Sequence, residues 1–235
     1  TSERSAAATA DALIAEAINP QTREKLFLID KFLPANASKT KLEHSLDQSL
    51  ATVGTDYFDL YLLHWRGGIP LAETVNELER VKKAGKIKAW GGSNFDVNDL
   101  EESWRLKNGT NCVANEDLYN LDSRGLEFDL LPLMKQHQLP LIAYSPLAQG
   151  DSLSGKLTDN SLLKEIAANH HATVNQIMLA WVLRIGNVLA IPKSSSPKHA
   201  EENVAAGNIE LSDDELLALQ KEFPSPTKKE PLAVI

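Results

Sequence analysis

The stretch Phe58–Trp65, FDLYLLHW, decides the fold class of this chain. It is an apolar run rich in residues that favour strands, and it ends on a histidine and a tryptophan. The segment that follows, Pro70–Ala84, carries apolar residues at spacings of three and four, which predicts a helix that stops at Gly85. A second strand-like run, Ile87–Phe95, comes next. Strand, helix and strand in this order predict a parallel βαβ unit.

The same alternation continues along the rest of the chain. Six apolar runs have the length and composition of strands: Leu26–Leu33, Phe58–Trp65, Ile87–Phe95, Cys112–Tyr119, Leu139–Ser145 and Val188–Pro192. Amphipathic stretches predict helices over Lys39–Val53 and Pro70–Ala84, and two more within Asn160–Arg184. A last helix begins at Ser212, which has the spacing of a capping box with Glu215. Strands that alternate with helices predict an α/β protein with a parallel sheet.

Such a sheet can be open and doubly wound, or closed into a barrel. The glycine fingerprint GxGxxG of the open dinucleotide-binding sheet is absent after the first strand, so a (β/α)8 TIM barrel is preferred. That barrel needs eight strands, whereas residues 2–18 have a helical composition with no strand before them. We therefore expect a single barrel domain over residues 1–235, with the N-terminal one or two strands absent and a C-terminal tail over residues 224–235.

Composition narrows the class of protein. The net charge of −8 and the lack of a basic cluster argue against a nucleic-acid partner. No apolar run is long enough to span a membrane, and the polar N-terminus is not that of a signal peptide. The single cysteine, Cys112, has no histidine or lysine beside it, so we expect a plain buried residue. A lone cysteine also fits a reducing, cytoplasmic compartment, and we expect a monomer.

Polar residues at strand ends are the candidates for chemistry, because the active sites of barrels lie at the carboxyl ends of the strands. Lys31 lies among apolar neighbours, which points to function or to an ion pair with Asp30 or another carboxylate. His64 is an acid/base candidate or a hydrogen-bonded core residue. Ser93 and Asn94 follow two glycines, which suggests either a backbone that something approaches closely or a turn.

The later strands carry further candidates. Tyr144 can offer a flat face for stacking, or it can pack in the core. The loop after the last strand holds Lys193 and three serines before a helix, which suits a phosphate, and a serine-rich helix cap is the alternative. Trp65 and Trp90 are candidate walls of a substrate pocket, with core packing as the alternative for Trp90. The histidines have poor spacing for a metal, so no metal site is expected.

Taken in order, these strand ends resemble the aldo-keto reductase family over most of the chain. Asp56–Trp65 resembles the family's D-Y-[LIV]-D-L-x-L-x-H segment, and Gly91–Phe95 resembles its G-V-S-N-[FY]. Ile191–Ser194 together with Glu202–Asn203 resembles its I-P-K-[SG]-x(7)-E-N. The run Leu118–Glu127 looks like that of bacterial members that reduce small aldehydes such as methylglyoxal.

The resemblance implies a mechanism and a role for each candidate. In the family a hydride passes from the nicotinamide to a carbonyl, a tyrosine protonates the product, a lysine paired with an aspartate lowers the pKa of that tyrosine, and a histidine orients the carbonyl. Lys31 and His64 match the catalytic lysine and histidine, and Trp65 becomes a pocket residue. The implied cofactor contacts are Ser93, Asn94 and Glu116 on the carboxamide, Tyr144 on the nicotinamide ring, Ser145 and Leu147 on the pyrophosphate, Lys193 and Ser194 on the 2′-phosphate, and His199, Glu202 and Asn203 near the adenine.

Three departures from the family pattern matter. The family's aspartate and tyrosine lie in a D-x-A-x-x-Y tract, and no such tract precedes Lys31. We expect that a stretch carrying this tract is omitted between residues 13 and 14. Glu116 stands where the family usually has glutamine, and a carboxylate cannot donate a hydrogen bond to the carboxamide oxygen. His199 stands where many NADPH-preferring members have arginine.

The sequence thus predicts an NADPH-dependent reductase of small aldehydes and ketones, with NADH as a second option and a small carbonyl compound as substrate. The alternative is a nicotinamide-binding barrel with weak catalysis that acts as a redox sensor or regulatory subunit. A phosphate-binding sugar isomerase on the same barrel is a third, weaker hypothesis, because it leaves Ser93–Asn94 and Glu202–Asn203 unexplained.

Overall fold

The computed structural model of the protein describes residues 11–148 and 157–235. The chain divides into two compact units, unit 1 (Thr1–Ala114) and unit 2 (Asn115–Ile235). The strands of the described residues are β1 (Ile29–Phe32), β2 (Phe58–Leu63), β3 (Ile87–Ser93), β4 (Cys112–Leu118), β5 (Leu141–Tyr144) and β6 (Val188–Ala190). Each lies within one of the six runs predicted from the sequence, so those predictions are confirmed.

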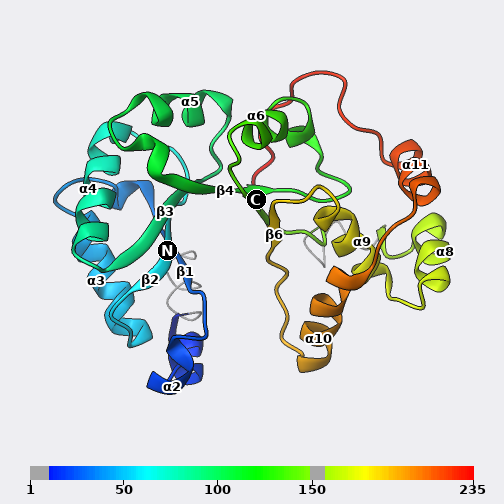
Figure 1. The fold of residues 1–235 in the computed structure, drawn as a ribbon, viewed down its shortest axis with the longest axis horizontal. Coiled ribbons are helices and arrows are strands. Elements are labelled where there is room, and N and C mark those ends of the chain that lie inside the picture. The colour runs from blue at the N-terminus through cyan, green and yellow to red at the C-terminus, as the bar shows by residue number, and fades with distance from the viewer. Residues whose placement is uncertain (1–10, 149–156) are drawn as a thin grey trace. The chain divides into compact units, whose positions relative to one another are not determined.

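Unit 1 is built on β1, β2 and β3, which pair in parallel. Lys31 lies opposite Leu62, and Leu63 lies opposite Gly92. Its elements of helix are α2 (Pro20–Arg23), the 3-10 turn Pro34–Asn36, α3 (Leu42–Val53), α4 (Leu71–Lys83), α5 (Val97–Arg105) and the 3-10 turn Gly109–Asn111. Residues 11–17 are also helical. The N-terminal helix is predicted over residues 2–18, and residues 2–10 of that prediction lie outside the described residues. Figure 1 shows α3 and α4 packed beside the strands of this unit.

The helices α3 and α4 form where the apolar spacing predicts them. The residues that α3 buries are Leu42, Leu46, Leu50 and Val53, and α4 buries Leu71, Val75, Leu78 and Val81 among others. Gly54 ends α3 with a φ of 74°, and Gly85 follows α4 with a φ of 80°. Glycine adopts this left-handed conformation without the steric cost that a side chain brings. The chain therefore turns back toward the sheet at both places.

Unit 2 continues β4 and adds β5 and β6, again in parallel. Glu116 lies opposite Ile142, and Ile142 lies opposite Leu189. Its elements of helix are the 3-10 turn Gly125–Glu127, α6 (Leu130–Gln136), α8 (Ser161–Asn169), α9 (Val174–Leu183), α10 (Pro197–Ala205), the 3-10 turn Ala206–Asn208 and α11 (Asp213–Glu222). The two helices predicted within residues 160–184 are confirmed as α8 and α9. The capping box predicted at Ser212 is confirmed at the start of α11.

Gly91 and Gly92 lie inside β3, and the chain turns only after the strand, at Asn94, so both interpretations of that segment hold in part. A Cβ atom on Gly91 would lie 2.4 Å from the carbonyl oxygen of Ala114. A Cβ atom on Gly92 would lie 2.8 Å from the ring of Phe95. Real side chains do not tolerate such distances, so the close approach expected here is made by the protein's own chain.

Trp90 and Cys112 are core residues. Trp90 is 2% exposed, and its indole N–H donates to Glu79 Oε1 at 2.6 Å. The suggestion that Trp90 lines a substrate pocket is therefore wrong, because its ring is enclosed and its one polar atom is satisfied inside the protein. Cys112 is buried, and burial raises the pKa of its thiol to about 11, which confirms a plain buried cysteine.

The described residues bear on two further features, namely helices that could span a membrane and groups of side chains that could bind a metal ion. Among the helices of residues 11–148 and 157–235, none combines the length and the apolar composition needed to cross a bilayer. Within the same residues, no group of three or more histidine, cysteine or acidic side chains could hold a metal ion.

Candidate functional site

The carboxyl ends of β1, β2 and β3 bring four predicted residues together in unit 1. The backbone N–H of His64, just after β2, donates to the carbonyl oxygen of Phe32 at the end of β1 (3.0 Å). The Asn94 side-chain amide donates to the carbonyl oxygen of His64 at 3.0 Å and to Ser93 Oγ at 3.2 Å. Lys31 precedes Phe32 in β1, so Lys31, His64, Ser93 and Asn94 share one edge of the sheet.

Asn94 has a backbone conformation that is uncommon for a residue with a side chain. Its φ is 53°, in the left-handed region, where asparagine is tolerated better than most residues. This turn ends β3 and directs the Asn94 amide back to the main chain of His64. Ser93 is fully buried beside it. Such conformations occur often at binding sites, where the surrounding structure holds them in place.

Asp30, suggested as a partner of Lys31, contacts the main chain of that residue. Its Oδ1 accepts from the backbone N–H of Lys31 at 2.7 Å. Neighbouring residues of a strand point to opposite faces of the sheet, so the two side chains diverge. Burial raises the pKa of the Asp30 carboxyl to about 6, although the Lys31 N–H bond opposes that change. Asp30 is therefore a desolvated acid in β1, and its carboxyl hydrogen-bonds to the main chain of Lys31.

Trp65 borders His64 as the sequence predicts. The two rings meet edge to face, with centroids 4.6 Å apart and an interplanar angle of 80°. Trp65 is 36% exposed, which is high for a tryptophan. The indole thus offers an open apolar surface next to the histidine, as a substrate pocket requires.

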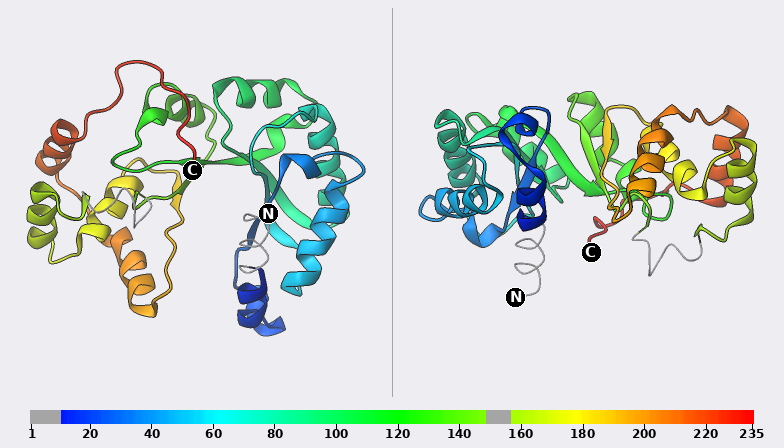
Figure 2. Two further views of the ribbon diagram at one scale, coloured as in Figure 1. Left: turned by 180° about the vertical axis from the view of Figure 1, so that it is seen from behind. Right: turned by 90° about the horizontal axis from the view of Figure 1, so that it is seen from below.

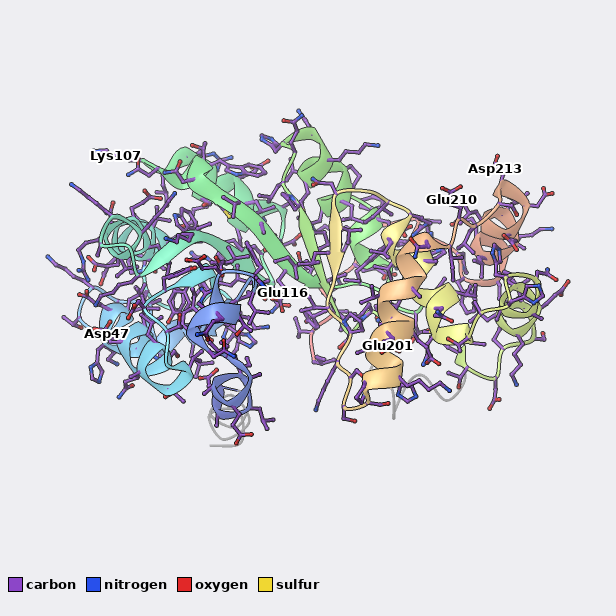
Figure 3. All side chains as sticks on the ribbon, turned by 60° about the horizontal axis from the view of Figure 1, so that its bottom comes forward. Asp47, Lys107, Glu116, Glu201, Glu210 and Asp213 are labelled. Carbon is purple, nitrogen blue, oxygen red and sulfur yellow. The ribbon has the colours of Figure 1, made fainter. Side chains whose placement is uncertain are left out.

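The carboxyl ends of β4 and β5 hold the predicted residues of unit 2. Glu116 in β4 is 1% exposed, and Tyr144 at the end of β5 is half-buried. Figure 3 shows Glu116 on its strand, whereas Glu201 and Asp213 lie on the outer helices of this unit. Burial and the nearby carboxylates of Asp117 and Glu116 raise the pKa of the Tyr144 hydroxyl to about 12.

The residues after β5 turn sharply. Ser145 has a φ of 47°, and its carbonyl oxygen accepts from the Asn120 side-chain amide at 2.9 Å. Leu147 is half-buried two residues later. The amide of Asn120 therefore ties the end of β4 to the end of β5, and Ser145 and Leu147 follow Tyr144 at the same edge.

The loop after β6 has the features of an anion seat. The backbone N–H of Ile191 donates to the carbonyl oxygen of Ala143 (3.1 Å), which fixes where the loop leaves the sheet. Lys193 and Ser194 are exposed. The helix α10 begins just after Ser196, and no side chain of the described residues caps its first N–H groups. Free N–H groups at a helix start and a nearby lysine both favour a phosphate.

The last predicted cofactor residues lie along α10, which buries no side chain in the described structure. His199 is exposed, and Asn203 is half-buried. Glu202 lies 3.7 Å from the Lys198 ammonium, and its carbonyl oxygen accepts from the Gln176 side chain at 3.0 Å. These three residues thus lie on one helix, next to the loop that has the features of an anion seat.

Neither of the two tyrosines in unit 1, Tyr57 and Tyr61, has the placement of a proton donor next to Lys31. Tyr57 precedes β2, at the end of the strand opposite to His64, and Tyr61 is fully buried within it. Tyr119 donates to Glu127 at 2.6 Å. Burial raises the pKa of both the Tyr61 and the Tyr119 hydroxyls.

One group of interacting residues was not singled out from the sequence. The buried Arg124 and the half-buried Glu127 form an ion pair at 2.6 Å in unit 2. Their spacing of three residues is a recognised signal for such a pair. The tail predicted over residues 224–235 is attached to them, because Ser225 Oγ donates to Glu127 at 2.7 Å.

Comparisons with known proteins agree on one family. The sequence model of the Aldo/keto reductase family matches residues 6–221. The chain is 43% identical to Methylglyoxal reductase YeaE of Escherichia coli, over all of this chain and 82% of that protein. It is 34% identical to Glyoxal reductase of Bacillus subtilis, over 83% of this chain and 67% of that protein.

A solved structure extends the likeness to three dimensions. The crystal structure of an aldo-keto reductase from Klebsiella pneumoniae in complex with NADPH matches with a TM-score of 0.95 and 42% identity, over 97% of this chain and 80% of that chain. Together with the parallel strands, this confirms the prediction of a (β/α)8 barrel fold. The described residues contain six of the eight strands that a complete barrel has.

Proposed function

Because this chain belongs to the aldo/keto reductase family, we propose that it is an NADPH-dependent reductase of small aldehydes and ketones. The observation that carries the proposal is the group of Lys31, His64, Ser93 and Asn94 at one edge of the sheet in unit 1. Methylglyoxal is the substrate to test first, since two relatives are named as reductases of methylglyoxal and glyoxal.

The chain's own residues divide the work of reduction between them. NADPH supplies the hydride when it is bound. His64 donates a hydrogen bond that orients the substrate carbonyl, and the open face of Trp65 packs against the substrate. The Lys31 ammonium would stabilise negative charge that develops near it and would lower the pKa of the tyrosine that the family resemblance implies in the omitted stretch, and that tyrosine would give its proton to the product oxygen. Catalysis thus needs Lys31 charged and His64 correctly hydrogen-bonded.

The chemistry of the residues in the proposed cofactor site suits the binding of a nicotinamide dinucleotide, with one exception. The half-buried Tyr144 ring suits stacking on an aromatic ring, and Ser93 and Asn94 suit a carboxamide. The exposed Lys193 beside the uncapped start of α10 suits a 2′-phosphate, which favours NADPH over NADH. Glu116 is the exception, because its carboxylate offers no donor to the carboxamide oxygen. We expect binding that is weaker than a glutamine would give.

The test is the consumption of NADPH, followed by its absorbance, with methylglyoxal as substrate. We expect turnover by the wild-type protein and a loss of kcat/KM of about 100-fold or more in Lys31→Met and in His64→Phe. Lys107→Met, at an exposed lysine far along the sequence, is the matched control and should keep full activity. Wild-type activity that survives both site variants would contradict the proposed roles.

Lys193 provides a separate test of cofactor choice. Lys193→Ala should raise the Kd for NADPH by about tenfold, because one charged contact to a phosphate is lost, and leave the Kd for NADH nearly unchanged. An equal effect on both cofactors would place Lys193 away from the 2′-phosphate.

A second candidate function is nicotinamide binding with little catalysis, as in a redox sensor or regulatory subunit. It is favoured by the absence of the D-x-A-x-x-Y tract before Lys31 and by the positions of Tyr57 and Tyr61, neither of which is a proton donor beside Lys31 within unit 1. NADPH binding without turnover of any small carbonyl would support this candidate over the reductase. A reducing, cytoplasmic location and a monomeric state also stay predictions.

A further inference from the structure

A cluster of polar residues in unit 2, most of them buried or half-buried, fastens the C-terminal segment to the body of that unit. The cluster, called the Arg124 cluster below, consists of Tyr119, Arg124, Glu127, Arg184, Gln220 and Ser225. Its members come from the end of β4, the 3-10 turn after it, the end of α9, and the end of α11 with the residues that follow. Segments about a hundred residues apart in sequence therefore meet at one point.

Arg124 is the residue that holds this cluster together. Its side chain is 5% exposed. Its guanidinium donates to Gln220 Oε1 at 2.7 Å, to Ser225 Oγ at 2.6 Å, and to the carbonyl oxygen of Phe223. The planar fork of arginine can serve several acceptors at once, which lysine cannot do. Three of its acceptors thus belong to α11 or to the chain just after it.

Glu127 completes the charge balance of the cluster. It pairs with Arg124 at 2.6 Å, accepts from the Tyr119 hydroxyl at 2.6 Å, and lies 3.2 Å from the Arg184 guanidinium. Arg184 and Arg124 also lie over the Trp181 ring, at 3.6 and 5.0 Å from its centroid. Burial alone would raise the pKa of the Glu127 carboxyl, but the bonds from Arg124, Tyr119 and Ser225 hold that pKa below its ordinary value.

The segment from Phe223 onward continues from this anchor to the end of β5. The Lys229 ammonium pairs with Asp129 at 2.7 Å. At the end of the segment, the backbone of Ile235 hydrogen-bonds the Tyr144 hydroxyl. Figures 1 and 2 show the red segment leaving α11, passing α6 and ending beside the strands of unit 2.

Little apolar burial holds residues 227–235 of this segment in place. Of these nine residues, only Leu232 is half-buried, and the other eight are exposed. Burial of apolar surface is the main force that fixes chain segments, at about 25 cal/mol per Å². Since it is nearly absent here, the polar anchors at Arg124 and Asp129 decide where the segment lies.

We propose that Arg124 is a positioning residue which, by fastening the segment Phe223–Ile235, holds the Tyr144 ring in the orientation that receives the nicotinamide. The inference rests on the proposed function, in which Tyr144 stacks on that ring. Arg124 touches neither cofactor nor substrate in this scheme. It acts through the segment and the Ile235 contact to the Tyr144 hydroxyl.

The anchoring is tested without cofactor by limited trypsin digestion. Release of the peptide that follows Lys229 is measured by mass spectrometry in wild type, Arg124→Gln and Ser225→Ala. We expect release to be about tenfold faster in both variants, because each loses hydrogen bonds to a buried charge. Ser225→Ala keeps the Arg124–Glu127 pair, so it serves if Arg124→Gln fails to fold. Arg105→Gln, at a 73% exposed arginine in α5, is the matched control.

The coupling to Tyr144 is tested with NADPH. We expect Arg124→Gln and Ser225→Ala to raise the Kd and the KM for NADPH by about fivefold, with kcat within about twofold of wild type, since the lost contacts position the ring and do not stabilise charge. Arg124→Lys should resemble Arg124→Gln, because a lysine cannot replace the fork. Faster peptide release with an unchanged NADPH Kd would overturn the coupling, and unchanged release would overturn the anchoring. Lack of NADPH binding by the wild type would instead defeat the proposed function while the digestion result still stood.

Discussion

Asp30 is a buried acid whose ionisation costs stability. Its pKa is raised from 3.8 to about 6 in the folded protein, mainly by burial, so the folded state binds its proton more tightly than the unfolded chain does. Stability from this group is therefore present at low pH and is lost as the pH rises from about 4 to about 6. Asp30→Asn should stabilise the protein by about 1–3 kcal/mol at about pH 8 and hardly at all at about pH 4.

Urea unfolding at the two pH values, followed by circular dichroism, measures this effect. Asp47→Asn is the control, because Asp47 is half-exposed and pairs with Lys86 at the surface. A gain in Asp30→Asn that is the same at both pH values would mean that the carboxyl is not desolvated as the structure indicates.

Glu116 is one of two residues in the proposed cofactor site, with His199, that depart from the family pattern to which the sequence was compared. Glu116→Gln supplies an amide donor at a position that is 1% exposed. We expect the Kd for NADPH to fall by about three- to tenfold, since a buried acceptor gains a hydrogen bond. Cofactor binding measured by protein fluorescence checks this, with Glu201→Gln on the surface of α10 as control. A Kd that rises would show that the carboxylate itself is needed.

At the scale of elements, β3 depends on a position without a side chain. Gly91→Ala places a methyl group 2.4 Å from the Ala114 carbonyl oxygen and 2.8 Å from Leu62 Cδ2. Backbone cannot move aside cheaply within a sheet, so we expect a loss of about 1–3 kcal/mol in the free energy of unfolding. Gly207→Ala is the matched control, because nothing lies within 4 Å of its added methyl group. Equal stability of the two variants in urea unfolding would refute the close packing at Gly91.

The ends of the helices can be predicted from the local sequence, whereas the positions of the helices in the folded unit cannot. The capping boxes at Thr173 and Ser212 and the glycine at residue 54 follow from residues within one turn of each helix. The position of α11 depends on the Arg124 side chain, which lies 96 residues from its partner Gln220. No pattern within one element carries that information.

For the molecule as a whole, the main departure from the family pattern is the missing D-x-A-x-x-Y tract. Residues 11–17 are helical across the place where we expect an omitted stretch, which leaves that expectation a prediction. We expect the intact protein to be heavier than the 25.8 kDa of this chain. Mass spectrometry measures this directly. A mass of 25.8 kDa would contradict the hypothesis that a stretch is omitted, and it would favour the second candidate function, nicotinamide binding with weak catalysis.

The six strands, the main helices, their caps, the family and the residues at the strand ends could all be predicted from the amino-acid sequence. These follow from local chemistry, namely the two-residue and 3.6-residue periods of strand and helix and the side chains that suit turns. The sequence also named Lys31, His64, Ser93 and Asn94, because a parallel sheet brings strand ends to one edge whatever the details of packing. The roles of the strand-end residues stay proposals.

The environment of each side chain, in contrast, became known from the folded chain and not from the sequence. The tertiary structure placed Trp90 in the core, turned the carboxyl of Asp30 to the main chain of Lys31, and showed that the close approach at Gly91 comes from Ala114. It also showed that the tail is fastened at Arg124. The physical reason is that burial, pKa and hydrogen bonding depend on groups brought together from distant parts of the chain, and a sequence pattern records only neighbours.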